Sequence, residues 1–217
     1  SSSDPKVAKV EDGKVTGIAE GTATITATTV NGLKDSCKVT VTKQKPSLQY
    51  QSHVADYGWL SSVSEGKTSG TTGENKQMEA IKIELNSGSY KGSIEYSSHV
   101  QDYGWMSWIG NGKESGTTGK NKQMEAIKIR LTGDIAKEYN IYYRVHVEEM
   151  GWLDWASNGE AAGSTGYSYQ IEAIEIKLVE KGGTAPGTTT KPFEQRHYIK
   201  YAAHVADYGW LAEVYER

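Results

Sequence analysis

The sequence contains one cysteine, Cys37, and one phenylalanine among its 217 residues. A single cysteine excludes a disulfide within the chain, so a fold of this length must be held together by its buried side chains. No apolar run approaches the roughly 18 residues of a membrane-spanning helix, which predicts no membrane span. The formal net charge of −3 argues against nucleic acid as a partner, because nucleic-acid binding needs a basic surface.

Aromatic residues with a polar group are abundant instead, since the chain has 14 tyrosines and six tryptophans. Such residues are common at interfaces and at sugar-binding sites, and they also suit the surface of an all-β protein. The hydrophobic fraction of 36% and the charged fraction of 24% are typical of a globular chain rather than a disordered one.

One heptapeptide recurs four times along the chain. "HVADYGW" at 53–59 returns unchanged at 204–210, with "HVQDYGW" at 99–105 and "HVEEMGW" at 146–152. The first three copies are spaced by ~46 residues, and repeats of this period indicate an array of similar structural units. We expect the fourth copy to be truncated and the whole chain, which opens with Ser1, to be a fragment of a longer protein.

Each copy has the pattern of β-hairpins. In Met124–Leu131 the apolar Ile127, Ile129 and Leu131 alternate with Lys128 and Arg130, and alternation with period 2 predicts a half-buried strand. No segment shows a 3.6-residue period. A unit this small cannot bury a core alone, so the three copies must pack together.

The sequence therefore predicts an all-β protein in which three ~46-residue repeats form one closed, β-trefoil-like module. Closure would remove exposed strand edges, and an open array is the competing arrangement. We expect Trp59, Trp105 and Trp152 to line the shared core, because one tryptophan stands at the same register in every copy. Trp210 is its counterpart in the fourth copy.

The first 44 residues differ from the repeats and predict three strands, at 13–18, 23–29 and 38–42. Three strands are too few for a β-sandwich, which needs about seven, so we expect half of that domain to lie before residue 1. The segment 181–196 is rich in Gly, Thr and Pro and is typical of a linker. It separates the module at 46–180 from the truncated copy at 197–217.

Two resemblances follow from these residues. "VAKVEDGKVTGIAEGTATITA" and "CKVTV" resemble the C-terminal half of a bacterial Ig-like group 2 domain, a partial sandwich at 1–44. "SHVQDYGWMSWIGNGKESGTTGKNKQMEAIKIRL" resembles a clostridial hydrophobic repeat, the ChW repeat, and matching blocks stand at 48–85, 94–131 and 141–178. The resemblance implies an extracellular location, secreted or attached to the wall of a Gram-positive bacterium, and a role in binding polysaccharide or other surface partners.

The second tryptophan of each copy is the first candidate site. Trp108 and Trp155 stand three positions after the first tryptophan, so in a strand they face the opposite side. An exposed indole is a stacking platform for a pyranose ring, although the same residue could instead cap the barrel or pack on a neighbouring copy. Ser62 replaces this tryptophan in the first copy, which predicts unequal sites.

Polar candidates stand close by in the sequence. Asp56 and Asp102 precede a Gly-Trp pair, where a carboxylate either accepts turn N–H groups or binds sugar hydroxyls. Asn111 and Asn158 precede glycine, so each is a hairpin signal first and a hydroxyl partner second.

Histidine and glutamate recur together in the first three copies, as His53, His99 and His146 with Glu79, Glu125 and Glu172. We expect a structural pair in which the histidine neutralises or hydrogen-bonds an inward glutamate. A catalytic centre needs one asymmetric constellation, so no catalytic residue is predicted. No metal site or cofactor is expected either, and Cys37 is interpreted as a core residue.

These observations predict a non-catalytic binding module of the cell surface that recognises a glycan of the host or of the cell wall. Trp108 and Trp155 would stack on the sugar, with Asp56, Asp102, Asn111 and Asn158 as polar partners. The alternatives are adhesion to a surface protein or to the wall, and an accessory domain of a larger secreted enzyme.

Overall fold

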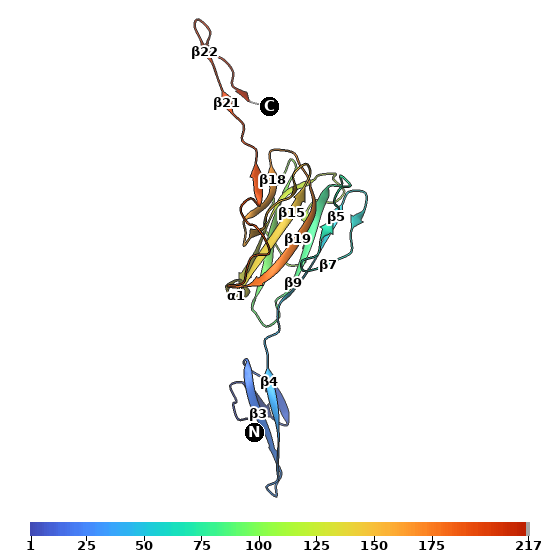
Figure 1. The fold of residues 1–217 in the computed structure, drawn as a ribbon, viewed down its shortest axis with the longest axis vertical. Coiled ribbons are helices and arrows are strands. Elements are labelled where there is room, and N and C mark those ends of the chain that lie inside the picture. The colour runs from blue at the N-terminus through green and yellow to red at the C-terminus, as the bar shows by residue number, and fades with distance from the viewer. Residues whose placement is uncertain (216–217) are drawn as a thin grey trace. The chain divides into compact units, whose positions relative to one another are not determined.

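The computed structural model describes residues 1–215, which divide into two compact units, one over Ser1–Pro46 and the other from Ser47 onward. The prediction of an all-β protein is confirmed, because 52% of residues lie in strands and 2% in helix. The helix within the described residues is α1 (Ile135–Glu138), and no helix there has the length and apolarity to span a membrane. The strands of both units are drawn in Figure 1.

The first unit consists of two antiparallel strand pairs. β1 (Ala8–Glu11) pairs with β2 (Lys14–Gly17), and β3 (Gly21–Thr28) pairs with β4 (Lys34–Val41). Three of these strands correspond to the predicted ones, whereas β1 was not predicted.

Cys37 is exposed on β4, so its interpretation as a core residue was wrong. Ala8 and Ala23 are the hydrophobic residues of this unit that lie within its buried core. Two strand pairs of this size supply too little apolar surface to cover both sides of a hairpin. Val39 and Val41 on the same side of β4 are therefore only half-buried, and Cys37 stays exposed.

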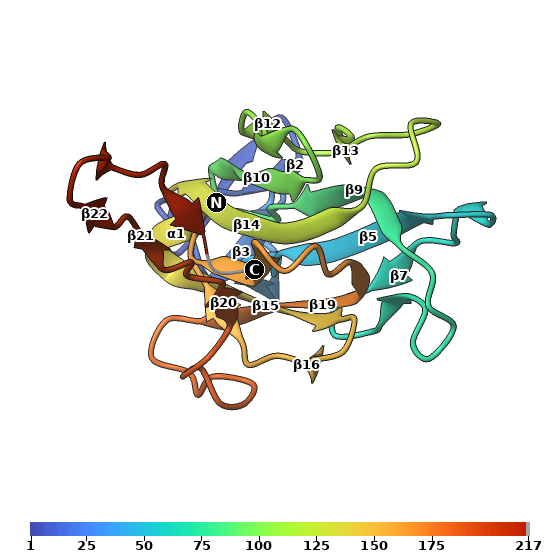
Figure 2. The ribbon, with the colours of Figure 1, turned by 90° about the horizontal axis from the view of Figure 1, so that it is seen from above.

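In the second unit, each of the three copies contributes two long antiparallel strands. They are β5 (Ser47–Val54) with β9 (Met78–Asn86), β10 (Gly92–Val100) with β14 (Met124–Gly133), and β15 (Tyr139–Val147) with β19 (Ile171–Glu180). Figure 2 shows these six strands arranged around a common centre.

Short strands follow the first long strand of each copy. They are β6 (Gly58–Trp59), β7 (Val63–Ser64) and β8 (Ser69–Gly70) in the first copy, β11 (Gly104–Trp105), β12 (Ile109–Gly110) and β13 (Ser115–Gly116) in the second, and β16 (Gly151–Trp152), β17 (Ala156–Ser157) and β18 (Ala161–Thr165) in the third. After the third copy come β20 (Phe193–Gln195), β21 (Lys200–Tyr201), β22 (His204–Val205), β23 (Gly209–Trp210) and β24 (Val214–Tyr215).

Each copy lends its last short strand to the sheet of another copy. β13 of the second copy pairs with β9 of the first, β18 of the third pairs with β14 of the second, and β8 of the first pairs with β19 of the third. The exchange is cyclic, so the three copies close into a ring and the expectation of a jointly folded module is confirmed.

The closed barrel of the trefoil prediction is wrong. The long strands of different copies do not pair with one another, and the strand pairings between copies are those of the short exchanged strands. The result is three separate sheets that face one interior rather than one continuous barrel.

A glycine permits each exchange. Gly116 has a φ of 109°, and a Cβ at this position would lie 2.3 Å from the carbonyl oxygen of Glu79 on β9. Gly70 and Gly163 make the same approach to Glu172 and Glu125. A side chain at any of these positions would push the lent strand away from its acceptor.

The shared core is lined by tyrosine and aliphatic residues, not by tryptophan. Tyr50, Tyr96 and Tyr143 are at most 1% exposed, whereas Trp105 is 37% exposed and Trp59 and Trp152 are half-buried. The expectation that the tryptophans line the core was therefore wrong. Tyr96 shares strand parity with the buried Ile94 on β10, while Trp105 lies on β11 beside the outward His99.

Two of the core tyrosines, Tyr50 and Tyr96, also tie copies together. The Tyr96 hydroxyl donates to the carbonyl of Lys113 in its own copy and accepts the N–H of Ile83 in the first copy, at 3.1 Å. Tyr50 bridges to Ile176 in the same way. Burial raises the pKa of Tyr50 and of Tyr96 to about 12, since the phenolate would lose its hydration.

One buried contact between two strands is a serine pair in two of the copies and an apolar pair in the third. The hydroxyls of Ser98 and Ser115 lie 2.8 Å apart, and Ser52 and Ser69 form the same pair in the first copy. The third copy has Val145 and Ala162 at these positions, both fully buried. Replacing both hydrogen-bond partners by apolar groups leaves no unsatisfied polar atom, so the packing is preserved.

Candidate binding faces on the three repeats

The outer side of each sheet carries a stack of side chains built on the repeated histidine. In the second copy, the Nδ1 atom of His99 lies 3.0 Å from Oε2 of Glu125, and the His99 ring meets Trp105 edge to face at 5.4 Å between centroids. The Nζ atom of Lys128 lies 4.1 Å from the centre of the Trp105 ring. The Trp105 indole is therefore held by two contacts, one with the His99 ring and one with the Lys128 ammonium group.

The same stack forms in the first and third copies. His53 and His146 pair with Glu79 and Glu172 at 3.1 and 2.9 Å, which agrees with the predicted structural pairs. These glutamates are almost fully buried. The fourth copy has the His204–Trp210 contact alone among the described residues, and its Trp210 is 72% exposed.

The cation of the third copy comes from a different strand. Glu175 stands at the position of Lys82 and Lys128, and Arg144 on β15 supplies the positive charge instead. Its guanidinium lies 4.7 Å from the Trp152 ring and is paired with Glu175 at 2.9 Å. The interaction with tryptophan is thus retained although the lysine is lost.

Three outer faces can be defined by the side chains around the tryptophans of each copy. Face 1 comprises Gln49, Trp59, Ser62, Lys82 and Glu84; face 2 comprises Glu95, Trp105, Trp108, Lys128 and Arg130; face 3 comprises Arg144, Trp152, Asp154, Trp155 and Glu175. Faces 1 and 2 use equivalent positions, whereas Arg144 and Asp154 of face 3 stand at the positions of Ser97 and Ser107 in the second copy.

Face 2 presents two indoles to solvent. Trp108 is 36% exposed, and the guanidinium of Arg130 lies 4.1 Å from the centre of its ring. Arg130 is held in turn by two hydrogen bonds to Oε2 of Glu95, at 2.9 and 2.7 Å. Because a cation lies over the ring of both Trp105 and Trp108, the two indoles are held in place without a ligand. The predicted exposure of Trp108 is confirmed.

Face 3 is covered by the chain itself. Trp155 is 5% exposed, so the expectation that it forms an accessible platform was wrong. A Cβ on Gly187 would lie 3.0 Å from the Trp155 ring, and the backbone N–H of Trp155 donates to the carbonyl of Thr188 at 2.8 Å. The cover comes from the segment that was predicted to be a linker.

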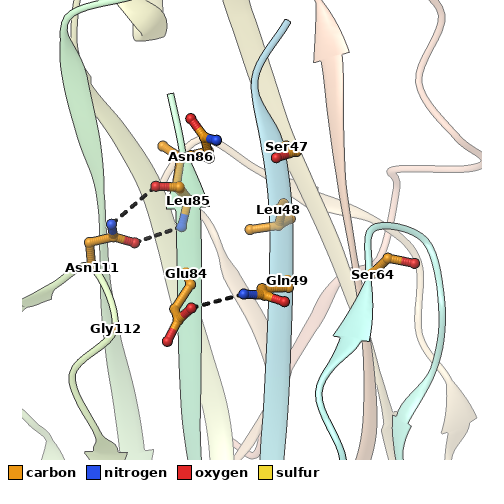
Figure 3. A pocket seen from close by; sticks show the side chains of 9 residues that line it. All are labelled: Ser47, Leu48, Gln49, Ser64, Glu84, Leu85, Asn86, Asn111 and Gly112. Atoms are coloured by element: carbon orange, nitrogen blue, oxygen red, sulfur yellow. Dashed lines mark hydrogen bonds between the residues drawn. The ribbon is translucent and has the colours of Figure 1, made fainter. Parts of the chain in front are cut away.

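Face 1 lacks the second tryptophan and is hollowed instead. Ser62 borders a hollow of about 140 Å³, which shares Gln49 and Glu84 with a larger groove of about 650 Å³. Figure 3 shows this groove, in which the Gln49 amide donates to Glu84 across the two strands at 2.9 Å. The prediction that Ser62 makes the copies unequal therefore holds for the shape of their surfaces.

Asn111 and Asn158 are engaged with the backbone. The Asn111 amide accepts from the N–H of Leu85 at 2.6 Å and donates to its carbonyl at 3.1 Å, as drawn in Figure 3. Asn158 accepts from the N–H of Ile141. Glu65, which stands at the same position in the first copy, accepts from Leu178 N–H, and burial raises the pKa of its carboxyl. These side chains serve the contacts between strands.

Asp56 and Asp102 lie in exposed turns with φ values of 68° and 66°. Their carboxylates form ion pairs with Lys76 and Lys122. Asp102 follows the end of β10, whereas Asn111 follows Gly110, which pairs with Glu95 near the start of β10. At about 3.3 Å per residue, the two are roughly 15 Å apart, so the predicted polar partners do not form one cluster around Trp108.

The cations were not predicted as part of these faces, although the sequence carried a signal. The lysine of the "EAIKI" block recurs in the first two copies as Lys82 and Lys128. Its parity is opposite to that of the buried isoleucines, which places it on the tryptophan side of the sheet. Within residues 1–215 no group of three or more His, Cys, Asp or Glu side chains has the arrangement of a metal site.

Comparison with known families identifies the repeats. The model of the family described as ChW, Clostridial hydrophobic W, matches residues 53–87, 99–133 and 146–180. Three segments, which together make up just under half of the chain, are thus similar to this family. Such repeats are commonly extracellular modules. The matched segments begin at the repeated histidine and include neither the first unit nor the fourth copy. No curated protein and no solved structure matched the chain.

Proposed function

We propose that the three ChW repeats form a non-catalytic, extracellular binding module that recognises carbohydrate through face 2. The observation that supports this most directly is the pair of half-exposed indoles, Trp105 at 37% and Trp108 at 36%. Sugar rings have apolar faces that stack on such indoles, while their hydroxyls remain solvated at the edge. The partial Ig-like unit at 1–44 is proposed as a spacer.

Ordering of the face supports affinity. Lys128 and Arg130 lie 4.1 Å from the centres of Trp105 and Trp108, and Glu95 holds Arg130. Side chains that are immobilised before binding lose little conformational entropy when a ligand docks. The exposed Tyr103, with Lys120 over its ring at 5.2 Å, extends the aromatic surface at one end.

Repetition of the His–Glu pair supports a structural role for it and a non-catalytic module. Each glutamate is almost fully buried, which leaves its carboxylate no access to a substrate. The same pair in three copies serves to orient three indoles.

The test is a glycan array followed by calorimetry with the best glycan, comparing the intact protein with Trp108→Ala. Loss of one stacked ring should weaken binding at least tenfold, or about 1.4 kcal/mol. Trp210→Ala is the matched control, because Trp210 is 72% exposed but has no cation over its ring among the described residues. It should leave the affinity unchanged.

The competing function is adhesion to a protein partner of the cell surface or the wall. A synthetic peptide with the sequence of residues 184–196 separates the two functions, because this segment already covers Trp155 on face 3. If the peptide binds to face 2 in a Trp108-dependent manner while no glycan does, the carbohydrate proposal fails. Equal glycan binding by Trp108→Ala and the intact protein would also contradict it.

A further inference from the structure

Face 3 contains the same chemical parts as face 2. Arg144 lies between two indoles, 4.7 Å from the centre of Trp152 and 5.0 Å from that of Trp155. Glu175 holds this guanidinium, as Glu95 holds Arg130 on face 2. The difference is access, since Trp108 is 36% exposed and Trp155 only 5%.

Residues 187–191 account for this difference in access. Gly187 lies against the edge of the Trp155 indole, where a Cβ would be 3.0 Å from both Cδ1 and Nε1. Glycine is the residue that allows the backbone to approach an aromatic ring this closely. The backbone N–H of Trp155 donates to the Thr188 carbonyl at 2.8 Å, which fixes the register of the cover.

Asp154 binds the segment through its carboxylate, and its backbone N–H also donates to the carbonyl of Lys191 at 3.3 Å. The carboxylate of Asp154 accepts a hydrogen bond from the Thr188 hydroxyl and from the N–H groups of Thr190 and Lys191, at 3.1 and 2.9 Å for the two N–H groups. The bond from Thr188, followed by that from Lys191, lowers the pKa of Asp154 because both favour the charged carboxylate.

The corresponding residues of the other copies cannot do this. Ser61 and Ser107 stand where the third copy has Asp154. A serine hydroxyl is shorter and uncharged, so it cannot accept three bonds from one extended segment. The covering segment follows only the third copy among residues 1–215, and Asp154 is the residue of that copy that can bind it.

The end of the segment is anchored separately. β20 pairs in parallel with β18, and Gly163 N–H donates to the Pro192 carbonyl at 3.0 Å. Release of residues 187–191 from Asp154 would thus leave the chain attached at β20, and only the indole would be uncovered.

We infer that face 3 is a second carbohydrate-binding site of the same class as face 2, closed in this structure by residues 187–191 through Asp154. The inference rests on the proposed function of face 2. When the segment leaves, Trp155 and Trp152 form a platform braced by Arg144, and the chain gains a second site for the same ligand.

The experiment uses the full chain with Asp154→Ser, which installs the residue of the other two copies. Acrylamide quenching of tryptophan fluorescence reports exposure of the ring. We expect greater quenching in Asp154→Ser than in the intact protein, and no such increase in Asp154→Ser/Trp155→Phe. Calorimetry with the glycan that binds face 2 should then show two sites per chain instead of one.

The outcomes separate the two proposals. In a Trp108→Ala background, binding that returns with Asp154→Ser supports face 3 as a site. Greater quenching without a second site, while the intact protein still binds through Trp108, overturns the inference and leaves the function of face 2 intact. No binding by either protein contradicts the function of face 2 itself.

A second variant covers the case in which Asp154→Ser alone does not open the face. Gly187→Ala adds a Cβ that would lie 3.0 Å from the indole, so the double variant Asp154→Ser/Gly187→Ala should displace the segment. If Trp155 remains protected from acrylamide in Asp154→Ser/Gly187→Ala, Asp154 does not hold the cover and the inference is overturned.

Discussion

The hydroxyl of Tyr50 accepts a hydrogen bond from the backbone N–H of Ile176, which lies 126 residues further along the chain. The bond joins the first copy to the third and closes the ring that the exchanged strands begin. Tyr96 makes the equivalent bond from the second copy to the first, through Ile83. Buried tyrosines therefore act as the ties between copies, while the tryptophans remain on the outer faces.

Removal of one tie should destabilise the whole module. In Tyr96→Phe the carbonyl of Lys113 and the N–H of Ile83 lose their hydroxyl partner in the core. Unsatisfied buried groups cost about 1–3 kcal/mol, so the free energy of unfolding in a denaturant titration should fall by that amount. Tyr103→Phe is the control, because Tyr103 is 51% exposed. A loss of equal size in both variants would contradict the role of Tyr96.

Alkaline pH should weaken the same ties. The pKa of Tyr96 is raised by burial to about 12, above the value near 10 of an unfolded tyrosine. The folded state therefore keeps its proton where the unfolded state has lost it, and stability falls as pH rises from about 10 to about 12. Absorbance of tyrosinate at 295 nm should rise in two steps, with the second step accompanied by unfolding. A single step near pH 10 with retained structure would disprove this.

The His–Glu pair should contribute stability in the full copies but not in the fourth. His99→Ala leaves the carboxylate of Glu125, which is 6% exposed, without its facing ring and removes the edge contact to Trp105. We expect a loss of about 2 kcal/mol in unfolding free energy. His204→Ala is the matched control, because His204 contacts Trp210 in an exposed hairpin. Its effect should stay within about 0.5 kcal/mol, and equal losses would argue against the buried glutamate as the cause.

The repeat period, the strand class and the joint folding of the copies could be predicted from the sequence, because period-2 alternation and a ~46-residue spacing are local signals. The identity of the core aromatic could also have been predicted. Tyr96 stands two positions after Ile94 and shares its face, whereas Trp105 aligns with the outward His99. Both the tryptophan and the tyrosine recur in every full copy, so recurrence does not show which of them lies in the core. The side of the strand on which each residue stands decides between them.

The burial of Trp155 could not be predicted from its own copy. Its cover, Gly187 and Thr188, comes from a segment whose Gly, Thr and Pro content is typical of a linker. The segment is ordered by Asp154, a single substitution relative to Ser61 and Ser107, and local patterns do not reveal such long-range pairing. The closed barrel was wrong for a similar reason, since the pairing of short strands between copies depends on register.

Face 2 should be transferable to the first copy, which offers the space for it. Ser62 borders a hollow of about 140 Å³ together with Gln49 and Glu84, the counterparts of Glu95 and Arg130. The triple variant Gln49→Glu/Ser62→Trp/Glu84→Arg installs the ion pair and the indole that it braces. Because Trp59 and Lys82 already form the adjacent stack, the rebuilt face should bind the same glycan with similar affinity.

Calorimetry should show the number of sites per chain rise by one in the triple variant. Ser62→Trp alone is the matched control, because its indole would face Glu84 instead of an arginine and should bind at least tenfold more weakly, or by about 1.4 kcal/mol. A folded triple variant with an unchanged number of sites would show that an indole braced by an Arg–Glu pair does not suffice for recognition, and that Tyr103 or another part of the second copy is required.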